Sequence, residues 1–406
     1  MEIQTLKNKC IVLGVSGSIA AYKAAALTSM LVKAGADVHV IMTKNATQLI
    51  GPATFENLTG NRCLLETFDR NHEFKVQHIS LAQRADLFII APASANVIAK
   101  VANGLADDML TTTFLACTCP KIIAPAMNTA MYENPVTQDN LKKCRSYGMS
   151  IAEGDAGYLA CGTSGKGRLA EPENLFVWIE HELPCKKDLA GKKILVTAGP
   201  TQESLDPVRY ITNHSSGKMG YAVAKAASRR GAEVTLISGP VALKELPFVN
   251  TVHITSAAQM AEAVKDNFFD SDILIKAAAV ADYRPANVSD QKIKKHDDDL
   301  SLPLERTEDI LAWCGKNKKS GQFLCGFSME TQNMVENSKA KLVKKNLDLI
   351  AANSLSSPDS GFAVDTNVLT LISPSSTKEL PVMQKEEAAD CLLDEIVLLM
   401  DKGNRA

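Results

Sequence analysis

The chain has no surplus of charge of either sign and few aromatic residues. Its 406 residues include 44 Lys and Arg against 46 Asp and Glu, and aromatic residues make up 5%. A strongly basic nucleic-acid binder or an acidic tail would need an excess of one sign gathered on one surface, so both classes are excluded. Small ligands, including nucleotides, remain compatible with this composition, and a chain of this length has room for two or three domains.

Long apolar runs and paired cysteines are also missing. No run approaches the roughly 20 apolar residues that span a bilayer, so no membrane partner is expected. The ten cysteines form no Cys-x-x-Cys pair, which indicates reduced thiols in a cytoplasmic protein and neither disulfides nor a zinc site. A basic start followed by residues 10–21 is compatible with a signal peptide, but the same stretch fits a buried strand, a tight turn and a helix start, which we favour.

A strand, turn, helix and strand follow one another twice along the chain. The two copies are predicted at Cys10–Val15, Ile19–Ala34 and Asp37–Met42, and at Lys193–Thr197, Met219–Arg230 and Glu233–Ser238. This repeated pattern predicts an α/β protein with two tandem doubly wound, Rossmann-like domains. We place the boundary in the polar stretch 183–192, which gives domains over residues 1–190 and 191–406.

Ligands of doubly wound sheets gather at the carboxyl ends of the strands, so polar residues that follow a strand are the candidate site residues. Further strands are predicted at Leu87–Ala91, Lys121–Ala124, Ile273–Ala277, Phe323–Phe327 and Leu349–Ala352, with a hairpin around Val368–Ile372. Helices are predicted at Glu173–Leu183, Val335–Lys345 and Glu386–Asp401.

In the first domain, several residues near strand ends are candidates for binding or chemistry. Gly17 and Ser18 stand where a strand gives way to a helix, so they could face an anion, although Ser18 as a plain helix cap is the alternative. Asn128 follows one strand and His78 precedes another, but a lone histidine is often structural. Cys161 lies in a glycine-rich stretch, which indicates movement or close backbone approach and favours a functional thiol.

In the second domain, residues 209–220 gather Arg, Asn, two Ser, Lys and two Gly before a helix. This composition suits phosphate or carboxylate binding, and a plain Gly/Ser loop is the alternative. Residues 277–283 place small residues and an acid at a strand end, which suits a ribose or base. The run 292–295 is a solvated charged face or a flap over a triphosphate, and Lys341 and Lys345 point the same way on one helix.

Motifs in both halves resemble one enzyme family. Residues 17–23 (GSIAAYK), His78, residues 125–128 (PAMN) and residues 160–168 resemble the flavin-containing cysteine decarboxylases. With the loops of the second half, the whole chain resembles the bifunctional phosphopantothenoylcysteine decarboxylase/phosphopantothenate–cysteine ligases of coenzyme A biosynthesis. The resemblance implies a flavodoxin-like, FMN-dependent decarboxylase domain followed by a CTP-dependent ligase domain.

The resemblance assigns roles in the decarboxylase half. FMN would oxidise the thiol carbon of 4′-phospho-N-pantothenoylcysteine so that CO₂ can leave, and later return the electrons to give 4′-phosphopantetheine. His78 would be the base for the oxidation, Asn128 would bind the departing carboxylate, and Cys161 would be the acid on a flap. The residues implied in FMN binding are Gly17, Ser18, Thr43, Ser94 and Asn96.

In the ligase half, the resemblance implies that CTP activates 4′-phosphopantothenate as an acyl-cytidylate, from which the amine of L-cysteine displaces CMP. Asn213 would position the acyl intermediate, Arg209 a substrate phosphate or carboxylate, and Lys292 the triphosphate. The other implied nucleotide-site residues are Ala278, Ala279, Asp282, Thr307, Glu308, Asp309, Ile310, Phe327, Lys341 and Lys345. Residues 307–309 depart from the Asn-Pro-Asp of the family, which puts an Asn side-chain role in doubt. Mg²⁺ would be held mainly through the CTP phosphates.

The sequence argues against two alternatives to the bifunctional enzyme. A flavin-binding regulator need not keep Cys161 or a complete ligase half, and this chain has both. An NAD(P) oxidoreductase built on the second domain would need the six-residue glycine fingerprint, which is missing. The resemblance further implies a homo-oligomer, in which decarboxylase trimers and ligase dimers form a dodecamer and His78 and Asn128 of one site come from different chains.

Overall fold

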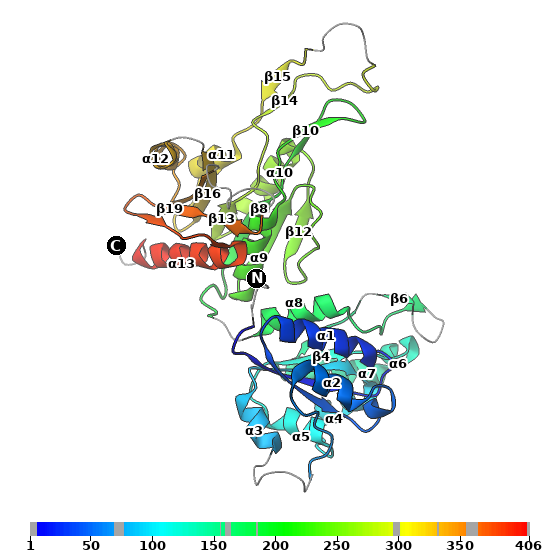
Figure 1. The fold of residues 1–406 in the computed structure, drawn as a ribbon. Helices are drawn as coiled ribbons and strands as arrows, with labels where there is room; N and C mark the ends of the chain where they lie inside the picture. The colour runs from blue at the N-terminus through cyan, green and yellow to red at the C-terminus, as the bar shows by residue number, and fades with distance from the viewer. Residues whose placement is uncertain are drawn as a thin grey trace. The chain divides into compact units, whose positions relative to one another are not determined.

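The computed structural model divides the chain into two compact units, Met1–Pro184 and Cys185–Ala406. The structure describes residues 6–68, 77–154, 156–158, 164–183, 186–294, 301–330, 333–354 and 364–403. Each unit is built on a largely parallel sheet with helices on both faces (Figure 1). Both units therefore have the doubly wound α/β architecture that the repeated strand–turn–helix grammar predicts. Within the described residues, no helix is both long enough and apolar enough to cross a bilayer.

The first unit is built on a five-stranded parallel sheet in the order β2-β1-β3-β4-β5. Its strands are β1 (Cys10–Val15), β2 (Asp37–Met42), β3 (Leu87–Ala93), β4 (Lys121–Pro125), β5 (Ser150–Ile151), and the separate pair β6 (Gly157–Tyr158) and β7 (Ser164–Gly165). Its helices are α1 (Ala21–Lys33), the short 3₁₀ helix η1 (Ala46–Gln48), α2 (Pro52–Thr59), α3 (Gln77–Arg84), α4 (Ala95–Asn103), α5 (Met109–Ala116), α6 (Thr129–Glu133), α7 (Pro135–Ser146) and α8 (Pro172–Glu182).

Successive side chains of β1 point to opposite faces of the sheet, so this strand contributes to two hydrophobic cores. Ile11 and Leu13 pack with α1, α2 and α8 on one face of the sheet, and Val12 packs with α3, α4 and α5 on the other. Because both faces are covered, β1 and β3 are apolar throughout, as expected for central strands of a parallel sheet. The two helical layers therefore leave the carboxyl ends of the strands as the edge where loops gather.

The second unit has an eight-stranded sheet in the order β12-β11-β8-β13-β16-β17-β19-β20. The strands of this sheet are β8 (Lys193–Ala198), β11 (Glu233–Ser238), β12 (Asn250–His253), β13 (Ile273–Lys276), β16 (Phe323–Glu330), β17 (Leu349–Ser354), β19 (Leu369–Ile372) and β20 (Thr377–Glu379). The first six in spatial order are parallel, and β19 and β20 add an antiparallel hairpin at one side, as expected around 368–372.

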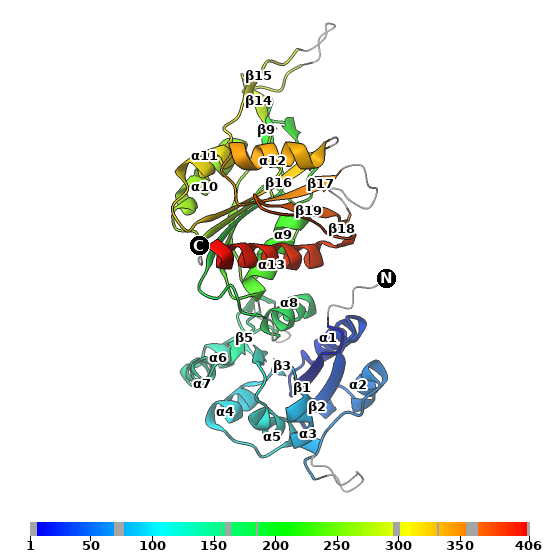
Figure 2. The same ribbon diagram turned by 90° about the vertical axis from the view of Figure 1, so that its left-hand side faces the viewer.

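Helices cover both faces of this second sheet (Figure 2). The helices are α9 (Lys218–Arg229) and α13 (Lys385–Gly403) on one face, and α10 (Ala257–Phe268), α11 (Ile310–Asn317) and α12 (Met334–Lys344) on the other. Three small pairs lie outside the main sheet: β9 (Gln202–Ser204) with β10 (Tyr210–Thr212), β14 (Tyr283–Pro285) with β15 (Leu304–Arg306), and β18 (Thr366–Asn367) with β21 (Met383–Gln384). The β14–β15 pair carries the connection that contains the polar segment 290–299.

Candidate active sites

The first unit has a cavity of about 650 Å³ at the carboxyl ends of β1, β3 and β4. Its lining combines small residues, polar side chains and two cations: Gly17, Ser18, Ile19, Ala20, Tyr22, Lys23, Ser94, Ala95, Ala126, Met127, Asn128, Met131, Gly167, Arg168 and Leu169. Four residues expected in the decarboxylase site, Gly17, Ser18, Ser94 and Asn128, thus come together from separate loops. The volume lies within the roughly 300–1,000 Å³ of small-molecule and cofactor sites.

Ser16 joins the two loops that form the floor of this cavity. Its buried hydroxyl donates to the carbonyl of Pro92 (2.7 Å) and accepts from the backbone N–H of Ser94 (2.8 Å). The next residue is Gly17, where a Cβ would lie 2.6 Å from the Cβ of Asn45. Glycine is therefore required by the close approach of the loop after β2, and Ser16 fixes the position of the loop after β3.

The remaining expected flavin residues lie around the cavity but do not line it. Thr43 follows β2, donates its N–H to Val15 and accepts from Ala46 with its hydroxyl. Asn96 lies exposed in the first turn of α4, two residues after Ser94, which caps that helix by accepting from Val97. The structure therefore brings Thr43 and Asn96 to the neighbourhood of the cavity, whereas Gly17, Ser18 and Ser94 form its wall.

Two cations and one carboxylate form a charged cluster at the cavity. Lys23 donates to both carboxylate oxygens of Glu171 at 2.9 Å, and Arg168 donates to the same carboxylate at 2.6 Å. The hydrogen bond from Lys23 is the largest cause that lowers the pKa of Glu171, so this group is ionised. Two positive charges thus share one negative charge, and the wall retains one net positive charge suited to an anionic ligand.

Asn128 lies at the cavity, but the histidine and cysteine of the expected site are not joined to it in the described chain. The Asn128 side chain accepts from Ala130 and so caps the short helix α6. His78 lies half-buried in the first turn of α3, and none of the described residues that line the cavity comes from α3. Cys161 lies outside the described residues, in the connection between β6 and β7.

In the second unit, backbone and side-chain hydrogen bonds gather the loops that follow β8, β10 and β13. Asn213 donates from its amide to the carbonyl of Ala279 (3.0 Å), whose own N–H donates to Gly199 (2.9 Å). Thr307 donates from its hydroxyl to Ala281 (2.6 Å) and from its N–H to Asp282 (3.0 Å). Asn213, Ala279, Asp282 and Thr307, and with them the adjacent Ala278, therefore share one region at the carboxyl edge of this sheet.

Asp309 and Lys345, two further residues predicted at the nucleotide site, form an ion pair beside this region. The Asp309 carboxylate caps α11 by accepting from Ala312 and lies 2.8 Å from the Lys345 ammonium. Lys276 is the last residue of β13. Lys345 repels its positive charge, and Asp309 and Asp282 attract it. Removal from water lowers the pKa of Lys276 more than any neighbour does.

Arg209 and Lys292 lie in two segments that one buried carboxylate holds together. Asp206 accepts from the Arg209 guanidinium (2.6 and 3.0 Å) and from the N–H of Ile293 (3.1 Å), while Arg209 donates to the Ile293 carbonyl (2.9 Å). The Arg209 hydrogen bonds are the main reason why the pKa of Asp206 is strongly lowered. Lys292 itself is exposed, and its backbone neighbour Ile293 is fixed by this clamp.

The other nucleotide-site residues are distributed around the same edge. Ile310 is the buried first residue of α11, and Phe327 is partly buried in β16. Glu308 pairs with Lys265 at 2.7 Å and lines, with Thr307, a cavity of about 420 Å³. Lys341 lies exposed on α12, four residues before Lys345. The structure thus separates Glu308 from the Asp309–Lys345 pair, although these residues adjoin in sequence.

Three side chains with a clear part in the two sites were not among the sequence candidates: Glu171, Asp206 and Lys276. Lys276 could have been found because a charged residue ends an otherwise apolar strand. Glu171 and Asp206 lie in ordinary polar loops and bind partners that are distant in sequence. The sequence therefore holds no comparable signal for them.

Sequence comparison identifies relatives over nearly the whole chain. The flavoprotein family matches residues 2–183, and the DNA/pantothenate metabolism flavoprotein C-terminal domain matches residues 189–399. The coenzyme A biosynthesis bifunctional protein CoaBC of Bacillus subtilis is 48% identical over 398 residues, which cover 97% of this chain and 98% of the relative. CoaBC of Escherichia coli strain K12 is 45% identical over 405 residues, which cover 99% and 100% of the two chains.

Solved structures similar to this chain match one half each. A crystal structure of the C-terminal domain of a coenzyme A biosynthesis bifunctional protein CoaBC is 43% identical and covers 53% of this chain and 100% of its own, with a TM-score of 0.46. A PPC decarboxylase mutant complexed with pantothenoylaminoethenethiol is 30% identical and covers 42% of this chain and 96% of its own, with a TM-score of 0.38. From the extent and identity of its full-length relatives, this chain belongs to the family of coenzyme A biosynthesis bifunctional proteins.

Proposed function

We propose that the chain catalyses two consecutive steps of coenzyme A biosynthesis. The second unit joins 4′-phosphopantothenate to L-cysteine with CTP, and the first unit decarboxylates the product to 4′-phosphopantetheine with FMN. The observation that carries this proposal is the full-length match to bifunctional relatives together with a separate polar site at the carboxyl edge of each sheet. Both reactions handle anionic substrates, which agrees with the cations at both edges.

The cavity of the first unit has the features that FMN binding requires. Its volume, the backbone turn at Gly17 and Ser18, and the amino end of α4 at Ser94 suit a phosphate-bearing ring system. The positive charge left by the Lys23–Glu171–Arg168 cluster favours a phosphate or a carboxylate. When bound there, FMN supplies the acceptor and donor of two electrons that a simple carboxylate substrate lacks.

The residues of this unit then have separable tasks. Asn128 lies at the cavity wall and can hold the substrate carboxylate with its amide. Cys161, carried on the connection between β6 and β7, would donate the final proton, since a thiol with an ordinary pKa of about 8.5 can serve as an acid near neutrality. His78 lies in α3, away from the described cavity wall, so we propose that it reaches the cavity of a second subunit as the base.

The ligase site lies at the carboxyl edge of the second sheet. Small side chains at Ala278 and Ala279 permit close approach of the nucleoside, and the Asp309–Lys345 pair and Phe327 lie around it. Asn213, hydrogen-bonded to Ala279, is placed to hold the acyl group while the amine of cysteine attacks. Lys292 would approach the triphosphate, with the Asp206–Arg209 clamp on Ile293 setting the base of its loop.

Mg²⁺ would be held through the phosphates of CTP, where it offsets their charge. Among the described residues of the second unit, no group of three His, Cys, Asp or Glu side chains converges as a ready protein site for a metal. We further propose an oligomer of decarboxylase trimers and ligase dimers, because His78 and Asn128 do not meet within one chain.

The test is product analysis by mass spectrometry after incubation of the full chain with 4′-phosphopantothenate, cysteine, Mg²⁺ and FMN. Parallel reactions contain CTP, ATP or no nucleotide. We expect 4′-phosphopantetheine, CMP and CO₂ with CTP. Accumulation of phosphopantothenoylcysteine would refute the decarboxylase assignment, and absence of every product would refute both assignments.

Two variants separate the halves. Asn213→Ala should abolish the ligase reaction and leave decarboxylation of supplied phosphopantothenoylcysteine intact, whereas Asn128→Ala should do the reverse. The matched control is Asn57→Ala. Asn57 is exposed, and its side chain donates a hydrogen bond to a backbone carbonyl of its own helix. Equal loss of both reactions in either site variant would contradict two independent sites.

A further inference from the structure

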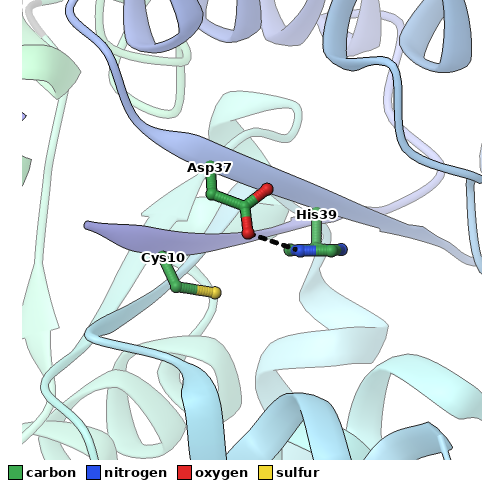
Figure 3. A group of neighbouring side chains, drawn as sticks. All are labelled: Cys10, Asp37 and His39. Atoms are coloured by element: carbon green, nitrogen blue, oxygen red, sulfur yellow. Dashed lines mark hydrogen bonds and ion pairs between the residues drawn. The ribbon is translucent and has the colours of Figure 1, made fainter. Parts of the chain in front are cut away.

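A thiol, a carboxylate and an imidazole converge at the amino edge of the first sheet, remote from the cavity at its carboxyl edge. Cys10 begins β1, and Asp37 and His39 lie at the start of β2. Potential ligand atoms of all three lie within 4.8 Å of one another (Figure 3). Among the described residues, this is the one group of at least three His, Cys, Asp or Glu side chains that could surround a metal.

Strand register explains why these side chains meet. Cys10 pairs with Asp37 in the parallel β1–β2 ladder, and His39 lies two residues further along β2. Side chains two residues apart on a strand share a face, so Asp37 and His39 lie on the same side as Cys10. This is the α3–α5 face, where Cys10 packs beside Leu81 of α3. The ligands come from two strands, so their spacing in sequence could not reveal them.

The carboxylate and imidazole are already oriented by neighbours. Asn61 donates to Asp37 Oδ1 (2.9 Å) and to the carbonyl of Val38 (2.9 Å), while His39 Nε2 lies 3.1 Å from Asp37 Oδ2. In a tetrahedral zinc site, nitrogen and oxygen ligands lie roughly 3.3 Å apart. The imidazole–carboxylate pair therefore needs little movement, and Asn61 supplies the outer hydrogen bond that such ligands use.

A cation already occupies the open side of this group. The Arg84 guanidinium lies 2.8 Å from Asp37 Oδ2 and 3.5 Å from His39 Nε2. Its side chain is 56% exposed, whereas that of His39 is 16% exposed, so Arg84 can leave for solvent while the imidazole stays. Arg84 thus marks the place where positive charge is stabilised, and it would compete with a metal for the same carboxylate oxygen.

We propose that Cys10, Asp37 and His39 form a site for Zn²⁺, which binds in place of the Arg84 guanidinium. One sulfur, one oxygen and one nitrogen ligand match the preferences of zinc, and a water completes four ligands. Binding releases the proton of the Cys10 thiol to solvent as the thiolate forms. The site is independent of FMN and of the ligase chemistry.

The test is titration of the chelator-treated, reduced full chain with Co²⁺, followed by competition with Zn²⁺. Cobalt bound to a thiolate gives a charge-transfer absorption that reports a sulfur ligand directly. We expect one ion per chain, with the absorption lost in Cys10→Ser and kept in Cys144→Ser, a buried thiol of the same unit. His39→Asn should weaken Zn²⁺ by more than the roughly 10- to 100-fold that loss of an outer-shell partner costs.

Arg84→Gln distinguishes a metal site from a simple ion-pair cluster. Removal of the competing charge should tighten Zn²⁺ binding about tenfold. Unchanged binding in both Cys10→Ser and His39→Asn, or absence of the cobalt–thiolate band in the wild type and in Arg84→Gln, would overturn the proposal. His39→Asn leaves the buried Cys10 in place, so the test does not depend on the folding of Cys10→Ser alone.

Discussion

Ser16 offers a direct test of how the cavity of the first unit is held together. Its hydroxyl is fully buried and bridges the loops after β1 and β3 through Pro92 and Ser94. In Ser16→Ala, the Ser94 N–H loses this acceptor, which costs about 1–3 kcal/mol for a buried group. The Pro92 carbonyl still accepts a hydrogen bond from the Ser16 N–H (3.2 Å), so the loss of its hydrogen bond from the Ser16 hydroxyl costs only about 0.5–1.5 kcal/mol. The first unit should therefore lose roughly 2–3 kcal/mol of unfolding free energy.

The measurement needs a probe of the first unit alone. The chain has two tryptophans, Trp178 in α8 of the first unit and Trp313 in α11 of the second. In a Trp313→Phe background, thermal unfolding followed by tryptophan fluorescence reports the first unit. A unit of this size shifts by about 2–4 °C per kcal/mol, so Ser16→Ala should lower the midpoint by roughly 5–10 °C.

Ser18→Ala is the matched control in the same loop. Its hydroxyl is half-buried and accepts from Ala20 at 3.4 Å, a weak bond whose loss should cost less than about 0.5 kcal/mol. Equal midpoints for Ser16→Ala and Ser18→Ala would refute the idea that the buried bridge holds the two loops. A large shift confined to Ser16→Ala would support it.

Four further changes test other contacts. Gly167→Ala should cost the first unit about 1–3 kcal/mol in the Trp178 assay, because φ is +103° and a Cβ would lie 2.6 Å from Met127 O. Glu171→Gln should slow decarboxylation and spare ligation by releasing Lys23 and Arg168, while exposed Glu173→Gln changes neither rate. Asp206→Asn should reduce ligation more than tenfold. Because the pKa of Asp206 is lowered in the folded protein, its carboxylate stabilises the fold above about pH 4, and this contribution is lost as pH falls through the folded pKa. The stability of the variant should therefore depend less on pH in acid. Lys276→Met should weaken CTP binding in calorimetry yet stabilise the second unit at neutral pH. Burial lowers the pKa of Lys276, so its charged form opposes folding in full below the folded pKa, and this cost disappears as pH rises from that pKa to the ordinary lysine pKa.

Local sequence patterns predicted the sheets well because central parallel strands are apolar on both faces. β1 and β2 have the bounds expected from their apolar residues, and α1 begins two residues later than the pattern indicates. Helices α2, α4, α5, α6, α7, α10 and α11 were not predicted. In α5, Thr111–Thr113 are three consecutive β-branched residues with low helix propensity. Burial of Leu110 and Phe114 and the capping box at Asp108 outweigh that propensity.

The candidate sites were harder to predict because their decisive contacts join distant segments. Lys23 and Glu171 are 148 residues apart, and Asp206 and Ile293 are 87 apart. Strand ends correctly indicated the edge of the sheet, which places Ser94 and Asn128 at one cavity. Nothing in a local pattern shows which carboxylate at that edge binds a cation, since this depends on how the loops pack.

Both units place cations beside a carboxylate at the carboxyl edge of the sheet. In the first, Lys23 and Arg168 share Glu171, and in the second, Lys345 pairs with Asp309 while Lys276 lies within its electrostatic reach. In the first unit, one carboxylate between two cations keeps both side chains in place and leaves one net positive charge. A single cation without the carboxylate would be less well ordered, and a fully neutralised pair would attract no anion. The carboxylate at each edge therefore acts as a positioning group, and its removal should reduce the rate at that edge alone.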